Sequence, residues 1–323
     1  MRILITGGFG YIGGRLAQHL SEAGHSVILG SRRKADPPGW LPSAVTGKTD
    51  WSNTVALKEI CSGVDVVVHA AAMNSKECAA NPAAALKFNG VSTATLVNLA
   101  AQVGVRCFIY LSTAHVYASP LIGTITEESC PLNLHPYATS HLAGEQAVLY
   151  AANQSNINGI VLRLSNVIGP PAHPLANCWM LLVNDLCLQA VRYRHLLLSS
   201  DGTARRDFIS MDDVCVAINT LLCLMKCEIQ VPVFNLGSEL SPTIWDMATH
   251  VADRCETLLG YRPPINHPLE TNQYRPPPDL IYRCDRLKAL GFNLKNAIAD
   301  EIDATLAFCE NNKGILCRLP NQA

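Results

Sequence analysis

The chain has 323 residues, 49% of them hydrophobic, and a formal net charge of −1 at pH 7. This length suffices for one large core, or for a nucleotide-binding domain with a smaller lobe. Because the composition has no basic excess, it argues against a nucleic-acid partner and against binding to an anionic membrane surface. We therefore expect small-molecule partners or a second copy of the chain.

The first strand pattern, "RILIT", follows Met1 at once, with no apolar signal segment and no small-residue cleavage site. The longest apolar runs are shorter than the roughly 20 residues that a membrane-spanning helix needs. The thirteen cysteines are scattered, without a CxxC pair or a Cys/His cluster. We therefore expect a cytoplasmic protein with no membrane span, with reduced and mostly buried cysteines and no metal.

Short β-branched runs alternate with helical stretches over the first 150 residues. Strand patterns lie at 2–6, 26–30, 64–71 and 106–112, and helical patterns lie between them, for example at 11–24 and 93–104. This alternation predicts βαβ units with helices on both faces of a parallel sheet. The predicted fold class is α/β, a Rossmann doubly wound parallel sheet with a smaller C-terminal substrate-binding lobe.

The alternation ends after the apolar run at 159–169. Pro-rich stretches follow at 169–178 and 262–280, together with further helices and a late strand pattern at 231–237. The change predicts a lobe that is interleaved with the sheet rather than joined to it by a linker. We assign residues 1–165 to an NAD(P)-binding Rossmann domain, with contributions from 205–240, and 166–323 mainly to the substrate-binding lobe.

The segment "ITGGFGYIGG" places a GxGxxG pattern, Gly8 to Gly13, between the first strand and the first helix. Glycines at these positions allow a tight turn and let the backbone approach a pyrophosphate at the helix N-terminus. A purely structural turn is the alternative. The strand, the helix and the βαβ series around the pattern favour a dinucleotide site.

The second strand pattern ends at Gly30 and is followed by Ser31, Arg32 and Arg33. An acidic residue that binds the ribose hydroxyls is expected about 20 residues beyond the glycines, and it would repel a 2′-phosphate. A serine and two guanidinium groups can instead accept a 2′-phosphate by charge-assisted hydrogen bonds. The sequence therefore favours NADP, with NAD possible if the two arginines are only solvated loop residues.

Motifs along nearly the whole chain resemble those of the extended short-chain dehydrogenases/reductases, in the sugar-nucleotide epimerase/dehydratase/reductase branch. They are "TGGFGYIG" at 6–13, Asp50, "VVVHAAA" at 66–72, Asn89, "LSTAHVY" at 111–117, "HPYATSHLAGE" at 135–145, "RLSNVIGP" at 163–170, "ARRDFISMDDV" at 204–214 and "NLGS" at 235–238.

The resemblance implies roles for individual residues. Cofactor-binding residues are implied at Gly7, Gly10, Tyr11, Ile12, Gly13, Ser31, Arg32, Arg33, Asp50, Trp51, Ala70, Ala71, Ala72, Asn89, Tyr137 and His141. Substrate-binding residues are implied at Ser112, His115, Asn166, Arg206 and Arg275. Arg205 is the alternative to Arg206, and whichever of the two faces away is equally well explained by an ion pair with Asp207 or Asp213.

The catalytic residues implied by the resemblance are Tyr137, Thr113 and His141. In the family the tyrosine is the general acid/base, a Ser or Thr binds the same sugar oxygen, and a lysine four residues after the tyrosine grips the nicotinamide ribose. Here "YATSH" places His141 at the lysine position. Residues 137 and 141 share one helix face, so an imidazole can reach the ribose while supplying less positive charge than lysine.

The direction of reaction then matters. Oxidation needs tyrosinate, and with a reference pKa of about 10 only roughly one tyrosine in a thousand is ionised at pH 7. Reduction needs the neutral phenol. The loss of lysine should therefore impair oxidation more than reduction, which agrees with the NADP signal and somewhat disfavours an epimerase.

The dehydratases of the family carry an Asp-Glu pair directly after the threonine, where this chain has Ala114 and His115. Without these carboxylates, elimination of water is disfavoured. His115 is either a hydrogen-bonded histidine of the cleft or an acid/base for epimerisation, and both interpretations remain open.

The predicted function is an NAD(P)-dependent enzyme acting on a nucleotide-linked sugar, either by 4-keto reduction or by epimerisation through a keto intermediate. The alternatives are a catalytically weakened dinucleotide-binding sensor and a reductase of a non-sugar carbonyl. The family also implies a homodimer paired through the helices at about 89–104 and 137–153, which carry apolar residues on more than one face.

Overall fold

The structure, a computed structural model, describes residues 1–154, 157–224, 232–267 and 278–319. The chain divides into two compact units. The first comprises Met1–Ser119, Glu127–Leu164 and Cys215–Leu236, and the second comprises Pro120–Thr126, Ser165–Val214 and Gly237–Ala323. Residues 120–126, which lie within the expected first domain, group with the second unit.

The first unit is built on a seven-stranded parallel sheet with the strand order β11-β7-β5-β4-β1-β2-β3. Its strands are β1 (Arg2–Thr6), β2 (Ser26–Ser31), β3 (Val45–Lys48), β4 (Val66–His69), β5 (Cys107–Thr113), β7 (Asn158–Leu164) and β11 (Val233–Leu236). Ile3 of β1 is in register with Val27 on one side and Val66 on the other. The order of the strands reverses at β1 and β4, and ligands of open parallel sheets bind at the carboxyl ends of strands at such a reversal.

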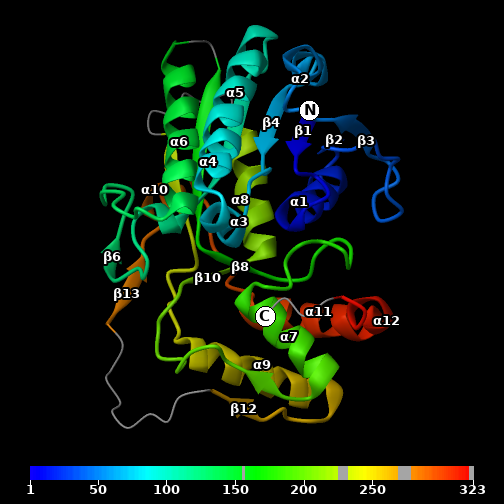
Figure 1. Cartoon of the computed structure of the whole chain (residues 1–323), viewed down its shortest axis with the longest axis vertical. Coiled ribbons are helices and arrows are strands. Elements are labelled where there is room, and N and C mark those ends of the chain that lie inside the picture. Colours follow the sequence, from blue (N-terminus) through cyan, green and yellow to red (C-terminus); the bar gives the residue numbers. More distant parts are fainter. Residues whose placement is uncertain (155–156, 225–231, 268–277, 320–323) are drawn as a thin grey trace. The chain divides into compact units, whose positions relative to one another are not determined.

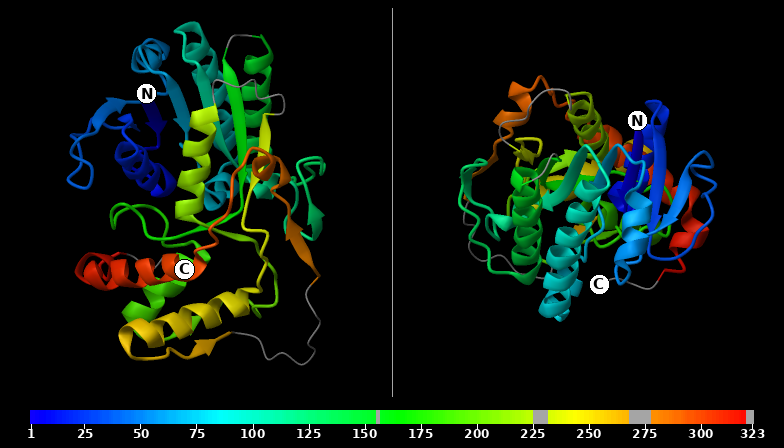
Figure 2. Two further views of the ribbon diagram at one scale, coloured as in Figure 1. Left: turned by 180° about the vertical axis from the view of Figure 1, so that it is seen from behind. Right: turned by 90° about the horizontal axis from the view of Figure 1, so that it is seen from above.

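Helices cover both faces of this sheet (Figures 1 and 2). On one face α2 (Thr54–Cys61), α5 (Thr93–Gln102) and α6 (Pro136–Gln154) pack side by side. On the other face lie α1 (Tyr11–Glu22) and α8 (Met211–Cys223), and His25 bonds Asn219 of α8 at 3.2 Å. Between β4 and α5 the chain forms α3 (Ser75–Ala80), α4 (Pro82–Ala85) and the π-helix η1 (Leu86–Ser92).

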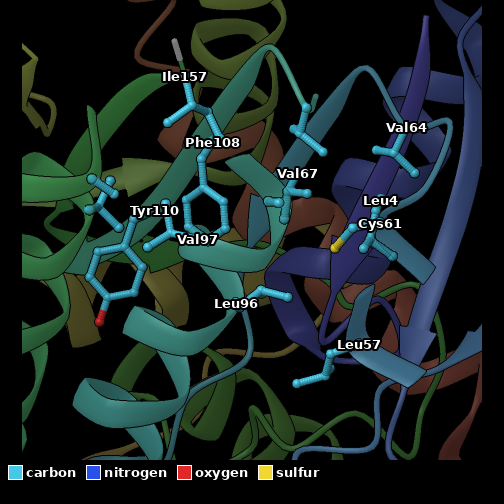
Figure 3. Packing of buried hydrophobic residues seen from close by; sticks show 14 of the residues in the cluster. Leu4, Leu57, Cys61, Val64, Val67, Leu96, Val97, Phe108, Tyr110 and Ile157 are labelled. Carbon is cyan, nitrogen blue, oxygen red and sulfur yellow. The ribbon is translucent and has the colours of Figure 1, made fainter. Parts of the chain in front are cut away.

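The hydrophobic core of the first unit fills the space between the sheet and the helices α2, α5 and α6 (Figure 3). The sheet contributes Leu4, Val67, Phe108 and Val161, and the helices contribute Leu57, Leu96, Val97 and Val148. Strands of a parallel sheet are buried on both faces, which explains their continuous apolar runs in the sequence. The core thus fixes the carboxyl ends of β1, β4 and β5, where the predicted site residues follow.

In the described part of the second unit, α7 (Leu182–Tyr193), α9 (Ile244–Leu259) and α11 (Ile298–Asn311) pack together, and α10 (Asp285–Ala289) and α12 (Lys313–Leu316) are short. Three parallel strand pairs accompany them: β8 (Asn166–Ile168) with β10 (Phe208–Ser210), β9 (Leu196–Leu197) with β12 (Ile265–Asn266), and β6 (Gly123–Ile125) with β13 (Leu280–Tyr282). The apolar run at 159–169 is therefore two strands, interrupted at Ser165 where the chain changes unit.

The predicted fold class is confirmed, and the strand patterns at 2–6, 26–30, 64–71 and 106–112 correspond to β1, β2, β4 and β5. All cysteines among the described residues are free thiols, and most are buried. Within the same residues, no helix has both the length and the apolarity to cross a membrane.

Candidate active site

The turn between β1 and α1 holds closely packed glycines. Gly7 has a φ of +68°, a left-handed conformation that glycine adopts without steric cost. A Cβ atom on Gly7 would meet the nitrogen of Ala71 at 3.0 Å, and one on Gly13 would collide with the carbonyl oxygen of Gly7. α1 begins after Gly10 with no side-chain cap and no acidic residue in its first turn. Its first amides, which include those of the predicted Tyr11 and Ile12, are therefore suited to an anion such as a pyrophosphate.

At the end of β2, Ser31 is partly buried, and Arg32 and Arg33 are exposed. The Ser31 hydroxyl accepts a hydrogen bond from the backbone nitrogen of Arg33 at 3.2 Å, which tightens the chain after the strand. A hydroxyl and two positively charged side chains thus follow one another at the end of β2, where the sequence predicts a 2′-phosphate.

Asp50 and Trp51 follow β3, the strand beside β2. Hydrogen bonds from Lys48, at 2.8 Å, and from Ser52 lower the pKa of Asp50 to about 2, so its carboxylate is ionised at neutral pH. The Trp51 ring packs edge-on against Phe88 with 5.3 Å between centroids, and its buried Nε1 has no partner among the described residues. The roles of Asp50 and Trp51 in cofactor binding remain predictions.

Asn89 of η1 is buried and connects the loop after β4 to α6. Its Oδ1 accepts a hydrogen bond from the backbone nitrogen of Met73 at 2.9 Å, and its Nδ2 donates to Ser140 Oγ at 3.0 Å. The predicted cofactor residues Ala70, Ala71 and Ala72 lie in this loop, directly after β4. Asn89 therefore holds the loop against the helix that carries Tyr137.

Tyr137, in the first turn of α6, lies within hydrogen-bonding reach of Thr113 at the end of β5. Burial raises the pKa of Tyr137, and the hydrogen bond with Thr113 opposes that shift. The Thr113 hydroxyl oxygen also accepts a hydrogen bond from the backbone nitrogen of His115 at 3.1 Å. The structure thus brings together the two hydroxyl groups that the sequence pairs, and it favours the neutral phenol.

His141 lies one turn after Tyr137 on the same face of α6, and the two rings meet edge to face with centroids 4.6 Å apart. The His141 side chain is only 2% exposed. Its Nδ1 lies 3.0 Å from the hydroxyl oxygen of Tyr110, while its Nε2 is buried with no partner among the described residues. Burial, and secondarily the nearby His115, lowers the pKa of His141 to about 4, so the imidazole is neutral at pH 7.

The hydroxyl of Ser112, a residue predicted to bind substrate, donates its proton to another side chain of the protein. The acceptor is Glu145 Oε1 at 2.5 Å, and Glu145 is in turn paired with Arg163 of β7, with 2.6 Å between Oε2 and Nη2. Arg163 Nη1 also donates to the hydroxyl oxygen of Tyr117 at 2.8 Å. We call Ser112, Glu145, Arg163 and Tyr117 the buried polar cluster.

His115 lies in the 3-10 helix η2 (Ala114–Val116) and is partly buried. Its carbonyl oxygen accepts a hydrogen bond from Asn133 Nδ2 at 2.7 Å, which anchors the main chain rather than the imidazole. Both interpretations of His115, as a hydrogen-bonded histidine or as an acid/base, therefore remain predictions.

The residues predicted to bind the nucleotide end of the substrate belong to the second unit. Asn166 of β8 donates from Nδ2 to the carbonyl oxygen of Asp207 at 2.8 Å, and Arg206 has an exposed side chain. Arg205 donates from Nη1 to the carbonyl oxygen of Ser241 at 2.9 Å. Arg275 lies outside the described residues.

The alternative explanation for Arg205 and Arg206, an ion pair with a nearby aspartate, is not seen among the described residues. The Asp207 carboxylate accepts a hydrogen bond from the backbone of Ser238, and the Asp213 carboxylate accepts them from the Ser210 hydroxyl and from the backbone of Lys295.

A family model described as the NAD dependent epimerase/dehydratase family matches residues 3–237, which is most of the chain. The chain belongs to this family. The dTDP-6-deoxy-L-talose 4-dehydrogenase (NAD(P)(+)) of Kitasatospora kifunensis is 30% identical to it over 252 residues, covering 75% of each chain. The dTDP-glucose 4,6-dehydratase of Streptomyces niveus is 25% identical over 344 residues, covering 97% of this chain and 94% of that relative.

Among solved structures, the UDP-glucose 4-epimerase of Thermotoga maritima with UDP-glucose matches with a TM-score of 0.79 at 23% identity. The match covers 97% of this chain and 100% of the epimerase, so the two share a fold along their whole length. The site fits the dinucleotide that gives the family its name, because the glycine turn leaves no room for side chains and α1 has no side-chain cap.

The sequence did not indicate the partners that hold the predicted catalytic residues. Tyr110, which contacts His141, was assigned only to a strand, and Glu145 was noted only as part of the motif at 135–145. An acidic residue eight positions after Tyr137, on the same helix face, was the available signal for the buried polar cluster.

Proposed function

We propose that this member of the family is an NAD(P)-dependent oxidoreductase of a nucleotide-linked sugar, acting by 4-keto reduction or by epimerisation through a keto intermediate. The observation that carries the proposal is the Tyr137–Thr113 hydroxyl pair beside His141, whose buried Nε2 has no partner in the described part of the chain. The activities for which the relatives are named, those of a dTDP-sugar dehydrogenase and a UDP-glucose epimerase, support a sugar linked to a nucleotide.

In the proposed mechanism two hydroxyl groups of the chain act on one sugar oxygen. The bound nicotinamide dinucleotide supplies or accepts the hydride. Thr113 hydrogen-bonds the oxygen of the reacting carbon, and Tyr137 donates a proton to this oxygen during reduction or removes one during oxidation. Asn166 and Arg206 are proposed to hold the diphosphate, since a guanidinium group can donate two parallel hydrogen bonds to it.

The protonation states favour reduction. His141 is neutral at pH 7, so it provides no positive charge that would lower the pKa of Tyr137. Burial raises the tyrosine pKa further, so less than one molecule in about a thousand carries tyrosinate at pH 7. Dehydration is disfavoured, because Ala114 and His115 stand where the dehydratases of the family carry two carboxylates.

The test is a substrate panel with the purified full chain. UDP-, GDP-, dTDP- and CDP-linked hexoses and their 4-keto forms are each incubated with NAD(H) or NADP(H), with nicotinamide absorbance and sugar NMR as readouts. Turnover of one nucleotide-linked sugar, absent with the free sugar, supports the proposal. Cofactor binding without turnover would indicate a sensor, and turnover of simple ketones alone would indicate a non-sugar reductase.

Substitution of His141 by lysine is expected to raise oxidation at pH 7 more than reduction. A lysine ammonium beside Tyr137 would lower the tyrosine pKa, whereas the neutral imidazole does not. In the wild-type chain, oxidation should rise continuously from pH 7 to pH 9 as tyrosinate forms, while reduction persists at neutral pH. The measurement is the pH profile of kcat in both directions. An equal loss in both directions for H141K would show that His141 has a positive role of its own.

We further propose that the chain prefers NADP over NAD, because Ser31, Arg32 and Arg33 follow one another at the end of β2, where a 2′-phosphate is expected. Charge-assisted bonds of this kind contribute about 1.5–3 kcal/mol each, so wild-type protein should bind NADP(H) at least tenfold more tightly. The double variant R32A/R33A should bind both cofactors equally. Calorimetry at fixed salt measures both affinities. R106A, which removes the arginine that pairs with Asp65, is the control. Equal affinities of the wild-type protein for the two cofactors would refute the preference.

We propose a homodimer formed through α5 and α6. The two helices carry a hollow of ≈ 380 Å³ lined by Asn98, Ala101, Gln102, Tyr150, Ala151 and Gln154, and Tyr150 is 68% exposed. Sedimentation at micromolar concentration should give twice the monomer mass, and Y150K should shift the equilibrium toward monomer. L258K, which places the same charge at an exposed position of α9, is the control. A monomeric wild-type mass would contradict the proposal.

A further inference from the structure

A chain of buried polar side chains extends from β4 to His141. His69 of β4 lies with Nδ1 2.6 Å from Thr6 Oγ1 and with Nε2 2.9 Å from Thr93 Oγ1. The Tyr110 hydroxyl is hydrogen-bonded to Thr93 and lies 3.0 Å from His141 Nδ1. All five side chains are at most 2% exposed, and Figure 3 shows the Tyr110 hydroxyl directed away from the apolar cluster.

The donor in each hydrogen bond of this series of side chains follows from one bond whose direction is fixed. The Thr93 hydroxyl donates its single proton to the carbonyl oxygen of Asn89 at 2.7 Å, and a carbonyl can only accept. Thr93 Oγ1 therefore only accepts from its other neighbours. His69 must carry its proton on Nε2, and its bare Nδ1 accepts from the hydroxyl of Thr6.

The same restriction sets Tyr110 and His141. Since Thr93 can only accept, the Tyr110 hydroxyl donates to Thr93 and has only its lone pairs left for His141. His141 must then donate from a protonated Nδ1. In a neutral imidazole the other nitrogen is bare, so Nε2, which has no partner among the described residues, is a hydrogen-bond acceptor.

Close packing keeps this geometry. A Cβ atom on Gly144, one turn after His141, would lie 2.6 Å from the Tyr110 hydroxyl oxygen and 2.7 Å from the carbonyl oxygen of Asn89. Glycine at this position lets the hydroxyl lie against the α6 backbone, within reach of His141.

We propose that Tyr110 and Thr93 are positioning residues that fix His141 as its Nδ1-protonated tautomer, so that bare Nε2 accepts a hydrogen bond from a ribose hydroxyl of the cofactor. The cofactor part of this inference rests on the proposed function, whereas the tautomer does not. A lysine at this position can only donate to the ribose. The histidine therefore reverses the direction of that hydrogen bond.

The test is ¹⁵N NMR of the full chain with labelled histidine, where H141Q identifies the His141 signals by their loss. A bare imidazole nitrogen resonates far from a protonated one, so the spectrum reports the tautomer directly. In wild-type protein without cofactor we expect a protonated Nδ1 and a bare Nε2. A protonated Nε2 in wild type would overturn the inference.

Two variants separate positioning from general damage. T93V removes the acceptor of the Tyr110 proton, so Tyr110 should donate to His141 and move the histidine proton to Nε2, whereas T93S should keep the wild-type tautomer. Y110F should leave Nδ1 without a partner and weaken NADP⁺ and NAD⁺ binding about three- to tenfold. An unchanged tautomer in folded T93V would overturn the positioning role of Thr93, and wild-type cofactor affinity in folded Y110F would overturn that of Tyr110.

Cofactor titration distinguishes this inference from the proposed function. Addition of NADP⁺ or NAD⁺ should shift the bare Nε2 signal of wild type while leaving Nδ1 protonated. If the tautomer is as expected but neither cofactor binds, the proposed function fails and the tautomer assignment stands. If the cofactor binds and the substrate turns over while Nε2 is protonated, the proposed function stands and the inference fails.

Discussion

Substitution of Tyr137 by phenylalanine is expected to lower kcat by about 10²- to 10⁴-fold in both directions, the usual contribution of a general acid/base. The phenol is the group that pairs with Thr113 at the end of β5, and the substitution leaves Thr113 and the neutral imidazole of His141 in place. Neither remaining group can protonate an alkoxide as effectively. The Thr113 hydroxyl is a weak acid, and the His141 imidazole presents a bare nitrogen to the ribose.

The measurement combines steady-state kinetics with calorimetry of cofactor and substrate binding. Binding should change little for Y137F, because only one hydroxyl group is removed. Y193F, which removes a hydroxyl from a 42% exposed tyrosine at the end of α7, is the matched control and should have wild-type kinetics. If Y137F is as active as wild type, another group is the acid/base and the role proposed for Tyr137 fails.

The fold was predictable because its signals are local. Each of the four predicted strands at the beginning of the chain is a mostly apolar run, as expected for strands buried on both faces of a parallel sheet. The roles of Gly7 and Gly13 could also be predicted from local sequence, since a left-handed turn and a close backbone approach require glycine. Tyr137 and His141 follow from a spacing of four on one helix.

What the sequence did not indicate depends on contacts between distant segments. Tyr110 reads as one more apolar residue of β5, and only the fold brings its hydroxyl to His141, 31 residues later. The bond from the Ser112 hydroxyl to Glu145 likewise joins residues 33 positions apart, and the substrate-binding role of Ser112 stays a prediction. The run at 159–169 contains the polar pair Ser165 and Asn166, but two polar residues within an apolar run do not by themselves show that the chain changes unit there.

The buried polar cluster should be the most sensitive point of the first unit. We expect R163M to lower the free energy of unfolding by about 3–5 kcal/mol, the usual cost of removing one partner of a buried ion pair. Glu145 is 0% exposed, and without Arg163 its carboxylate would be left buried with only the Ser112 hydroxyl and no counter-charge. Urea unfolding at pH 7, followed by circular dichroism, measures the loss.

Two further variants distinguish a buried charge from a simple loss of packing. R106M removes an exposed pair with Asp65, whose ions lie 2.7 Å apart, and should cost no more than about 1 kcal/mol. The double variant E145M/R163M removes both charges and should be more stable than R163M alone.

The double variant also tests the link to the active site. Glu145 lies one turn beyond His141 on α6 and bonds the residue next to Thr113, so its charge network joins the helix to the end of β5. E145M/R163M should therefore fold yet lose activity, because Thr113 is no longer held beside Tyr137. Full activity in a folded double variant would mean that the cluster stabilises the unit without positioning the site. A double variant no more stable than R163M would contradict the buried-charge explanation.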